Sequence, residues 1–472
     1  MKRVWENFKS LILTALIISS LFLTGSLWFD NYQGLYLLVS SLHNTVMDSL
    51  NTEEEYSIVY DKIIVPYKVT IVNPDKNKWI FYETDNLNTT AWNLAKARLN
   101  SLTDETEIIT GKVKEWDGLF ARKSVILEFG GALENDILKL AIPNLPKETN
   151  AFNDVEKIGI TKSLEGITIY ILQNDNSKKS LYKVLLKGED EEIETFMENC
   201  ENTKADVRYV ELEKVGTTKF YNNKEVITQS STLFPISNMA THRDLVKSIQ
   251  TSPHFNMDEE YTINRFIIDI FNNTDFAKFV TNDESNIFIN DDKSSIKFEK
   301  NGVVEYINNS KLSSEITPAS KNFNIAMEFI NNMRIYSNVY LLSAKEDESG
   351  EYIFRFSVAT DGIMVGFKEP IVDDDTHALM EIRVKDGSIR YFKGKLLDIK
   401  PNTRGVYISN FTHNILDNLL KEVDEEAKVN VSSVELMYVI DDSGTYYPSW
   451  LVKYSEKKSE KSGVSLTYTV KR

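Results

Sequence analysis

The sequence predicts an α+β protein, with a single N-terminal transmembrane helix followed by a multi-domain extracytoplasmic region of antiparallel sheets packed with helices. Three observations predict this fold class. Residues Ser10 to Phe29 are twenty consecutive uncharged residues at the start of an otherwise polar chain. Beyond them, short apolar segments end at tight-turn pairs such as Asn301-Gly302 and Asp386-Gly387. In the last third, a helix pattern followed by antiparallel strands occurs twice.

The uncharged segment, residues 10–29, predicts a transmembrane helix. At 1.5 Å per residue it is roughly 30 Å long, which matches the hydrocarbon core of a bilayer. Three basic residues and one acidic residue precede it, so we expect residues 1–9 to form a cytoplasmic tail. Aromatic residues flank it as interfacial anchors: Trp5 on one side, and Trp28, Phe29 and Tyr32 on the other. The remaining 443 residues are then extracytoplasmic, and the protein is a single-pass protein of the cell membrane.

A cleaved signal peptide is the alternative interpretation of the same segment, because it also has a basic start and an apolar middle. Here the apolar run is long, and the nearest small-residue site, Thr24-Gly25-Ser26, is a poor match to an Ala-x-Ala cleavage site. A cysteine for lipid attachment does not follow the segment. These features favour a retained anchor.

The composition excludes some classes of partner. The chain has 54 basic and 70 acidic side chains, and its net charge beyond residue 29 is −18. Such a surface repels nucleic acid and anionic lipid headgroups, so we expect no nucleic-acid partner. The single Cys200 cannot form an intrachain disulfide, which fits a Gram-positive surface, and its type favours a buried small residue over a reactive thiol.

We expect the first extracytoplasmic α+β domain to span residues 30–146. Leucines and valines from Leu35 to Leu50 recur at helical spacing and predict an amphipathic helix. Strands are predicted at 63–72, where Pro66 indicates an edge strand, at 79–82, and at 124–129, ending at Gly130-Gly131. Between them a helix is predicted from a cap at Thr89 or Thr90 to Leu102, with one apolar face made of Trp92, Ala95, Leu99 and Leu102.

The middle α+β domain is expected at residues 147–312. Strands 166–172 and 181–186 flank a polar turn, and a helix is predicted at 189–199. Thr241 and Asp244 have capping-box spacing ahead of Leu245 and Ile249, which predicts a helix starting there. A second helix is predicted at 263–271. Three strands then form a meander at 287–289, 295–299 and 303–307.

The C-terminal domain, residues 313–472, is predicted to contain two helix-plus-sheet units. Thr317-Pro318 caps a helix whose apolar face contains Ala326, Phe329, Ile330 and Met333. Hairpin strands follow at 352–359 and 363–367, and at 380–385 and 388–392. The order then restarts with a helix face of Ile415, Leu416, Leu419, Leu420 and Val423, followed by strands 434–440, 450–454 and 464–470. We expect each helix to cover one face of its sheet.

Signatures of catalysis are sparse. The five histidines are scattered without the spacing of a helical zinc site, and the chain has no nucleophile elbow or phosphate-binding glycine loop. Asp373-Asp374-Asp375 with His377 is either a divalent-cation site or a solvated loop, and we favour the loop. The acidic run 189–192 complements a helix dipole better than it fits a calcium site. We therefore expect no enzyme activity, cofactor or metal, although paired acids for glycan hydrolysis are invisible in a sequence.

The transmembrane segment carries a possible interaction surface. Ala15, Ser19, Phe22 and Ser26 follow one another at steps of four, three and four, which places them on one stripe of a helix. Small residues along a stripe let a second helix approach closely, although they are also common in single spans. The stripe predicts contact with a partner's transmembrane helix.

The chain resembles the YycH (WalH) family. The opening, Glu6-Asn7-Phe8-Lys9-Ser10 with Leu23-Thr24 ahead of Trp28, is similar to the family's N-terminus, although Phe29-Asp30-Asn31 replaces its usual Thr-Tyr-x-Pro. Lys123 to Phe129 and Ile287 to Tyr306 resemble its β-rich segments. Leu436-Met437-Tyr438 and Tyr447-Pro448-Ser449-Trp450 are similar to the closing strands of YycH, of its sister YycI and of peptidase-propeptide-like modules.

The resemblance implies a regulator without catalysis of its own. Family members pair with YycI and contact the sensor histidine kinase WalK (YycG), which controls cell-wall metabolism together with the response regulator WalR. It also implies that residues 313–472 form a YycI/propeptide-like domain. Two alternatives stay open: a membrane-tethered envelope protein whose propeptide-like modules bind a peptidase or a wall ligand, and a wall-modifying enzyme with an unrecognised site.

Overall fold

The computed structural model describes residues 60–468 with gaps, of which the longest are 212–219, 237–244 and 368–377. All of the described elements belong to one unit, residues 59–472. The predicted transmembrane segment, the helix at 35–50 and the stripe residues Ala15, Ser19, Phe22 and Ser26 lie outside the described residues. Among the helices that are described, none is long and apolar enough to cross a membrane.

The N-terminal part of the unit is an antiparallel sheet of seven strands in linear order. In spatial order the strands are β2 (Asn77–Tyr82), β1 (Lys68–Asn73), β4 (Ser124–Leu133), β5 (Val155–Ser163), β6 (Gly166–Asp175), β7 (Lys178–Lys187) and β3 (Ile108–Gly111). The short strands β8 (Arg208–Glu211) and β11 (Leu233–Ile236) extend it beyond β2. Strands β4 and β5 pair with each other, so the sheet continues across residue 146, the predicted boundary between the first two domains. The division into three domains stays a prediction.

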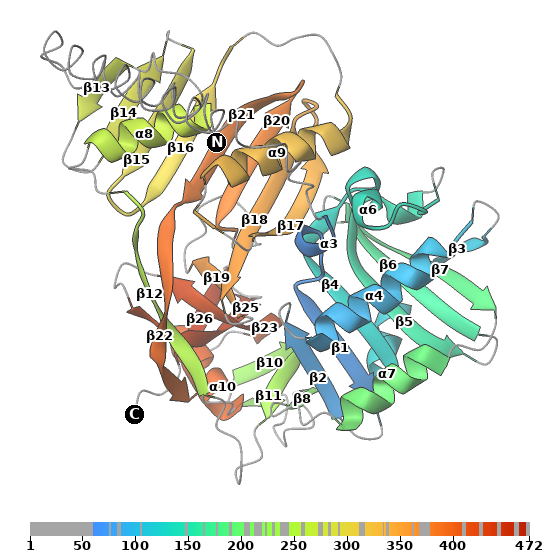
Figure 1. The fold of residues 1–472 in the computed structure, drawn as a ribbon. Helices are drawn as coiled ribbons and strands as arrows, with labels where there is room; N and C mark the ends of the chain where they lie inside the picture. The colour runs from blue at the N-terminus through green and yellow to red at the C-terminus, as the bar shows by residue number, and fades with distance from the viewer. Residues whose placement is uncertain are drawn as a thin grey trace, which may run out of the picture. The chain divides into compact units, whose positions relative to one another are not determined.

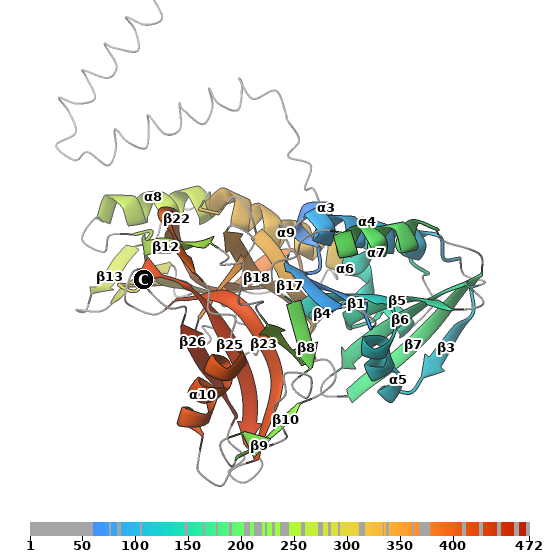
Figure 2. The same ribbon diagram turned by 90° about the horizontal axis from the view of Figure 1, so that it is seen from below.

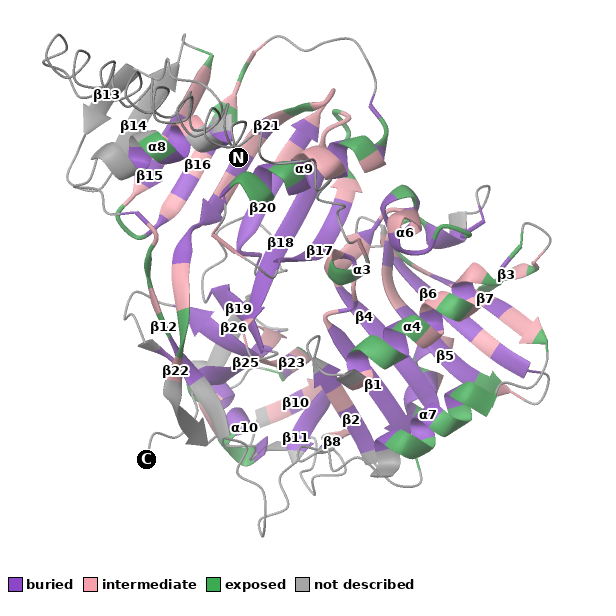
Figure 3. Ribbon diagram, viewed as in Figure 1, coloured by how far each residue is buried: buried purple, intermediate pink, exposed green. Residues whose placement is uncertain are grey.

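Helices cover both faces of this sheet. Helices α4 (Asn86–Asn100) and α7 (Glu191–Asn202) lie on one face, and α5 (Lys114–Asp117) lies on the other (Figure 2). The predicted apolar face of α4 is buried, whereas its outer face is exposed, as the colours in Figure 3 show. The short helix α3 (Tyr60–Ile63) precedes β1, and α6 (Asn135–Ala141) follows β4.

A second antiparallel sheet contains the strands of the middle region and of the first C-terminal unit. Its spatial order is β13 (Ala277–Thr281), β14 (Ser285–Asn290), β15 (Ser294–Glu299), β16 (Val303–Asn308), β21 (Ser388–Lys395), β20 (Met380–Lys385), β18 (Tyr352–Thr360) and β17 (Val339–Glu346). Helix α9 (Ala319–Met333) packs on β18, β20 and β21, and α8 (Glu260–Phe271) packs against α9 (Figure 1). The two sheets meet where Ala344 of β17 pairs in parallel with Leu133 of β4.

The last part of the chain builds a third group of strands around β23 (Lys428–Ile440). Strand β25 (Pro448–Glu456) pairs with β23 and with β26 (Ser462–Tyr468), while β10 (Lys224–Thr228) and β19 (Ile363–Phe367) pair in parallel with β23. The two-residue strand β9 (Phe220–Tyr221) pairs with β10. Helix α10 (Thr412–Glu422) packs on β26, β25 and β11. A separate ribbon joins β12 (Leu245–Pro253) to β22 (Leu397–Tyr407) and to β24 (Thr445–Tyr446).

The predicted helix-then-strand order occurs twice, and the predicted apolar faces of both helices are buried, although β19 of the first unit pairs with β23 of the second. Ala326, Phe329, Ile330 and Met333 of α9 are buried, as are Ile415, Leu416 and Leu419 of α10. The turn at Asp386-Gly387 is also confirmed, since both residues have the positive φ angles, 49° and 71°, that a tight hairpin requires. Gly302 has a φ of 88° in the predicted Asn301-Gly302 turn.

Several local predictions are wrong. Pro66 does not indicate an edge strand, because β1 begins at Lys68 and pairs on both sides, with β2 and β4. The predicted helix start at Leu245 is instead the strand β12, whose backbone pairs with β22. Helix α4 begins at Asn86, before the predicted caps, and α9 begins at Ala319.

Strand β4 also differs from the prediction, because it continues through Gly130-Gly131 to Leu133. A Cβ atom on Gly130 would lie 2.7 Å from Cδ2 and 3.2 Å from Cα of Leu342. The glycine therefore allows β4 to pack directly on β17 at the point where the two sheets meet, and only a residue without a side chain fits there.

Candidate functional site

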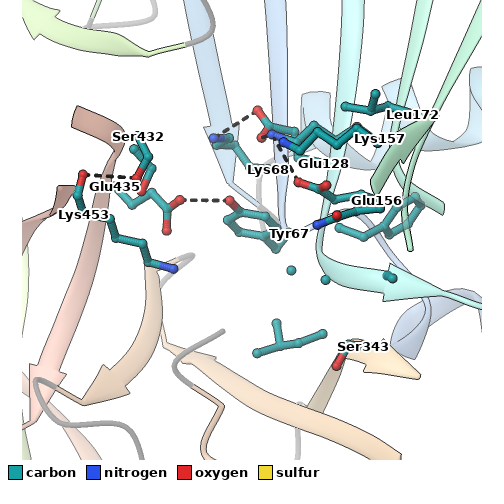
Figure 4. Close-up of a pocket in the computed structure, with 18 of the residues that line it drawn as sticks. Tyr67, Lys68, Glu128, Glu156, Lys157, Leu172, Ser343, Ser432, Glu435 and Lys453 are labelled. Carbon is teal, nitrogen blue, oxygen red and sulfur yellow. Dashed lines mark hydrogen bonds and ion pairs between the residues drawn. The ribbon is translucent and has the colours of Figure 1, made fainter. Parts of the chain in front are cut away.

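A cleft of about 1030 Å³ opens where the strands of the three sheets approach one another. One wall comes from β1, β4 and β5, the opposite wall from β23 and β25, and further lining residues from β17 and β18. Figure 4 shows Lys68, Glu128 and Lys157 on the first wall and Ser432, Glu435 and Lys453 on the second. Its volume lies at the upper end of the roughly 300–1,000 Å³ typical of ligand sites.

A buried chain of ion pairs runs along the first wall. Lys68 Nζ lies 3.0 Å from Glu128 Oε1, and Lys157 Nζ lies 2.7 Å from Glu128 Oε2. The strand register creates this chain, since Lys68, Glu128 and Lys157 are direct cross-strand partners on β1, β4 and β5. Glu128 is only 7 % exposed, so its charge depends on these two ammonium groups rather than on water.

Electrostatic interactions keep the side chains of Glu128 and Lys157 ionised. Burial acts to raise the pKa of Glu128, but the charges and hydrogen bonds of Lys157 and Lys68 outweigh it and lower the pKa to about 2. Burial acts to lower the pKa of Lys157, but the charges of Glu128 and Glu156 raise it above its ordinary value. Glu128 and Lys157 therefore stay charged over the whole physiological pH range.

The opposite wall is tied to the first by one hydrogen bond. The hydroxyl of Tyr67, the residue before β1, donates to Glu435 Oε1 of β23 over 3.1 Å (Figure 4). Burial acts to raise the pKa of Glu435, but the nearby charges of Lys453 and Lys68 lower it overall. The carboxylate of Glu435 is thus coupled to lysines of both walls.

Glu134, Asp154 and Glu346 line one end of the cleft and form an acidic corner. The Glu134 carboxylate accepts a hydrogen bond from the backbone N–H of Glu346, and Glu134 N–H donates to Ala344 O over 3.2 Å. Burial, together with the negative charges of Asp154, Glu346 and Asp136, raises the pKa of Glu134 to about 7. This corner therefore changes its charge near neutral pH at the junction of β4 and β17.

The acidic corner predicts a specific pH dependence of stability. The pKa of Glu134 is higher in the folded chain than its ordinary value of 4.5. Its contribution to stability is therefore complete below pH 4.5 and is lost as the pH rises through about 7. We expect Glu134→Gln to retain an acceptor for the Glu346 N–H and to be more stable than the parent at pH 8 by about 1 kcal/mol, a figure reduced for partial exposure. Urea unfolding between pH 5 and pH 8 measures the effect.

The matched control is Glu348→Gln, which neutralises an exposed carboxylate in the β17–β18 turn. It should leave the slope of stability against pH as it is in the parent. Equal slopes for the parent and Glu134→Gln over this range would contradict the assignment.

The described residues give no support for a metal site, since none of them form a group of three metal-ligating side chains. Asp373-Asp374-Asp375 and His377 lie outside the described residues, so the predicted choice between a cation site and a loop is untested. Glu191 and Glu192 are exposed in the first turn of α7, where they complement the helix dipole as predicted. Cys200 is fully buried, which confirms the interpretation of a small core residue.

The cleft is not predicted by the sequence patterns. A usable signal was present, because Glu128 is a charged residue inside the otherwise apolar strand β4. A buried charge needs a partner of opposite sign, but the sequence does not show which strands are neighbours. The four predicted contact residues of the transmembrane stripe cannot be compared with the cleft, because they lie outside the described part of the chain.

The fold is similar to that of YycH. The crystal structure of YycH from Bacillus subtilis superposes with a TM-score of 0.52 and 11 % sequence identity, covering 86 % of this chain and 96 % of that one. An uncharacterized protein from Eubacterium rectale has a TM-score of 0.33 at 14 % identity, over 56 % of this chain and 90 % of that chain. The chain matches no protein-family model and no curated protein sequence. The resemblance to YycH is thus confirmed for the fold.

Proposed function

We propose that this chain is a non-catalytic, membrane-anchored regulator of a cell-wall sensor histidine kinase of the WalK (YycG) type, acting together with a YycI-like partner. The observation that carries the proposal is the YycH-like fold, which extends over nearly the full length of the YycH structure. The basic tail, the uncharged segment 10–29 and the aromatic residues beside it supply the anchor that such a regulator needs.

The mechanism is a shift in the population of kinase states. A regulator that contacts two kinase conformations with different free energies biases the equilibrium between them, and neither partner needs to make or break a bond. The transmembrane stripe supplies one contact surface, and the extracytoplasmic sheets supply the other.

Co-purification and a bacterial two-hybrid assay test this proposal. The full-length chain in mild detergent should retain the kinase and the YycI-like protein of its own organism, and the two-hybrid signal should depend on residues 10–29. Failure of both partners to bind in both assays would overturn the proposal, and release of fragments from peptidoglycan would favour an enzyme instead.

Substitutions in the transmembrane stripe test its proposed contact with the kinase more directly. We expect the double substitution Ala15→Leu with Ser19→Leu to abolish co-purification of the kinase, because larger side chains prevent close approach of two helices. Thr24→Leu, on the opposite face of the same helix, is the matched control and should leave the complex intact. If the double variant retains the kinase as well as the control does, the stripe is not the contact.

A tethered binding protein is the second candidate function, and the cleft favours it. The cleft, of about 1030 Å³, is large enough for a ligand, and its polar and charged side chains could orient one. The two functions are compatible, because a ligand in the cleft can be the signal that the regulator transmits.

A further inference from the structure

Three β-bulges open onto the cleft, one in each group of strands. In β5 the pairing with β6 skips Glu156, in β17 the pairing with β18 skips Leu342, and in β23 the pairing with β25 skips Ser432. All three residues line the cleft. Bulges redirect side chains and cluster beside binding and active sites, so their coincidence here indicates a built site rather than a packing gap.

Polar atoms without partners lie at or next to these bulges. Glu156 Oε2, Ser343 Oγ and Ser433 Oγ are buried and have no hydrogen-bond partner. Ser343 is only 5 % exposed and lines the cleft. A buried polar atom without a partner costs about 1–3 kcal/mol, which a ligand with matching groups would recover.

The first wall also contains a stretch of β4 without a partner in β5. The β4–β5 register passes from Glu128↔Lys157 to Leu133↔Val155, so the β4 residues 129–132 have no Cα partner in β5. Gly131 and Ala132 of this segment are small residues that line the cleft, whereas Gly130 packs on Leu342 of β17. Extended peptides bind by adding a strand beside such backbone.

We propose that this cleft binds an extended peptide that carries an amino group. Glu156 Oε2 accepts from the ammonium group, and the hydroxyls of Ser343 and Ser433 bond to peptide amides. The β4 backbone at Gly131 and Ala132 pairs with the peptide backbone. The lining contains seven basic and seven acidic side chains, although the chain as a whole has a net charge of −16. This local balance suits a ligand with charges of both signs. The proposal stands independently of kinase regulation.

A sugar is the competing ligand class, because it also bonds to serine and glutamate. Sugars bind by stacking on exposed aromatic faces, but the aromatic liners Trp116 and Phe129 are buried, and the hydroxyl of Tyr67 is already bonded to Glu435. The described aromatic liners therefore favour the peptide.

Affinity selection tests the proposal. Full-length protein in mild detergent is immobilised and exposed to a pool of hexapeptides of the form Ala-Xaa-Lys-Xaa-Ala-Xaa, with Xaa randomised, and in a parallel arm to chitin oligosaccharides. Retained peptides are sequenced by mass spectrometry, resynthesised with a fluorophore, and titrated by fluorescence anisotropy. We expect retention of a peptide subset, and at least a tenfold weaker Kd for Ser343→Ala and for Glu156→Gln.

Controls separate binding from folding. Ser388→Ala and Glu194→Gln change exposed residues away from the cleft and should bind like the parent. Ser343→Ala removes an unpartnered buried hydroxyl, so its thermal midpoint without peptide should equal or exceed that of the parent. The proposal is overturned if the parent retains no peptide above the Ser343→Ala background, if both cleft variants bind as tightly as the controls, or if only the oligosaccharides bind.

Discussion

Glu128→Gln is expected to destabilise the folded chain by about 3–5 kcal/mol, the cost of breaking a buried ion pair by removing one partner. The substitution keeps the size of the side chain but leaves the ammonium groups of Lys68 and Lys157 without their shared carboxylate. Domains are stable by only about 5–15 kcal/mol, so this loss is a large part of the total. Urea unfolding at pH 7, followed by tryptophan fluorescence, measures it.

The same group predicts an acid dependence with a definite sign. The pKa of Glu128 is lowered from 4.5 to about 2 on folding, so its contribution to stability is complete above pH 4.5 and is lost as the pH falls toward 2. Glu128→Gln should remove that part of the acid destabilisation. The stability curves of the parent and the variant should therefore converge as the pH falls from 4.5 toward 2.

Two further variants show whether Glu128→Gln loses stability through charge or through packing. Glu194→Gln breaks the pair between Glu194 and Lys162, whose atoms are 2.6 Å apart but whose side chains are about half exposed, and it should cost less than 1 kcal/mol. Replacing Lys68, Glu128 and Lys157 together by Met, Leu and Met should recover most of the lost stability, because a buried ion network can be exchanged for apolar side chains. A triple variant as unstable as Glu128→Gln would assign the loss to packing instead of charge.

Local signals in the sequence predicted much of the fold. Hairpins such as β20–β21 were predictable because Asp386-Gly387 supplies the two positive φ angles between alternating strands. The faces of α9 and α10 were predictable because a helix buries residues at a spacing of three and four. The predicted resemblance to YycH agrees with the fold of the described residues.

Long-range pairing was not predictable. Strand β12 looked like a helix start because Leu245 and Ile249 are four residues apart, yet β22, which follows about 150 residues later, provides its hydrogen-bond partners. The cleft was not predictable for the same reason, because Lys68, Glu128 and Lys157 come from three separate strands. A sequence shows that a residue is charged and lies in an apolar strand, but only the register shows what it faces.

Trp450→Ala is expected to cost about 3–5 kcal/mol, as for other large aromatic side chains removed from a core. Trp450 is 1 % exposed and lies in a cluster that combines Val72 of β1 and Trp116 of α5 with Leu416 and Val429 from the end of the chain. Thermal or urea unfolding of the full-length protein measures the loss. Ile109→Ala, at a side chain 48 % exposed on β3, is the control and should change stability by less than about 0.5 kcal/mol.

The ring contact between Trp450 and Tyr209 separates packing geometry from buried area. The two rings are T-shaped, with centroids 6.3 Å apart and an interplanar angle of 73°. A double-mutant cycle with Trp450→Leu and Tyr209→Leu should give a coupling energy of about 0.5–1.5 kcal/mol. Additive losses would show that the two side chains act only through the area that each buries.

The position of Trp450 also connects this core to the cleft. It pairs with Leu436 across β23 and β25, one residue away from Glu435 in the cleft wall, while Tyr209 belongs to β8 beside β2. We therefore expect hydrogen exchange in Trp450→Ala to speed up in β2 and β8 as well as in β23 and β25, because one cluster supports both sets of strands. Faster exchange confined to β25 and β26 would mean that the N-terminal sheet and the end of the chain are stabilised separately, and that the cleft walls do not share a core.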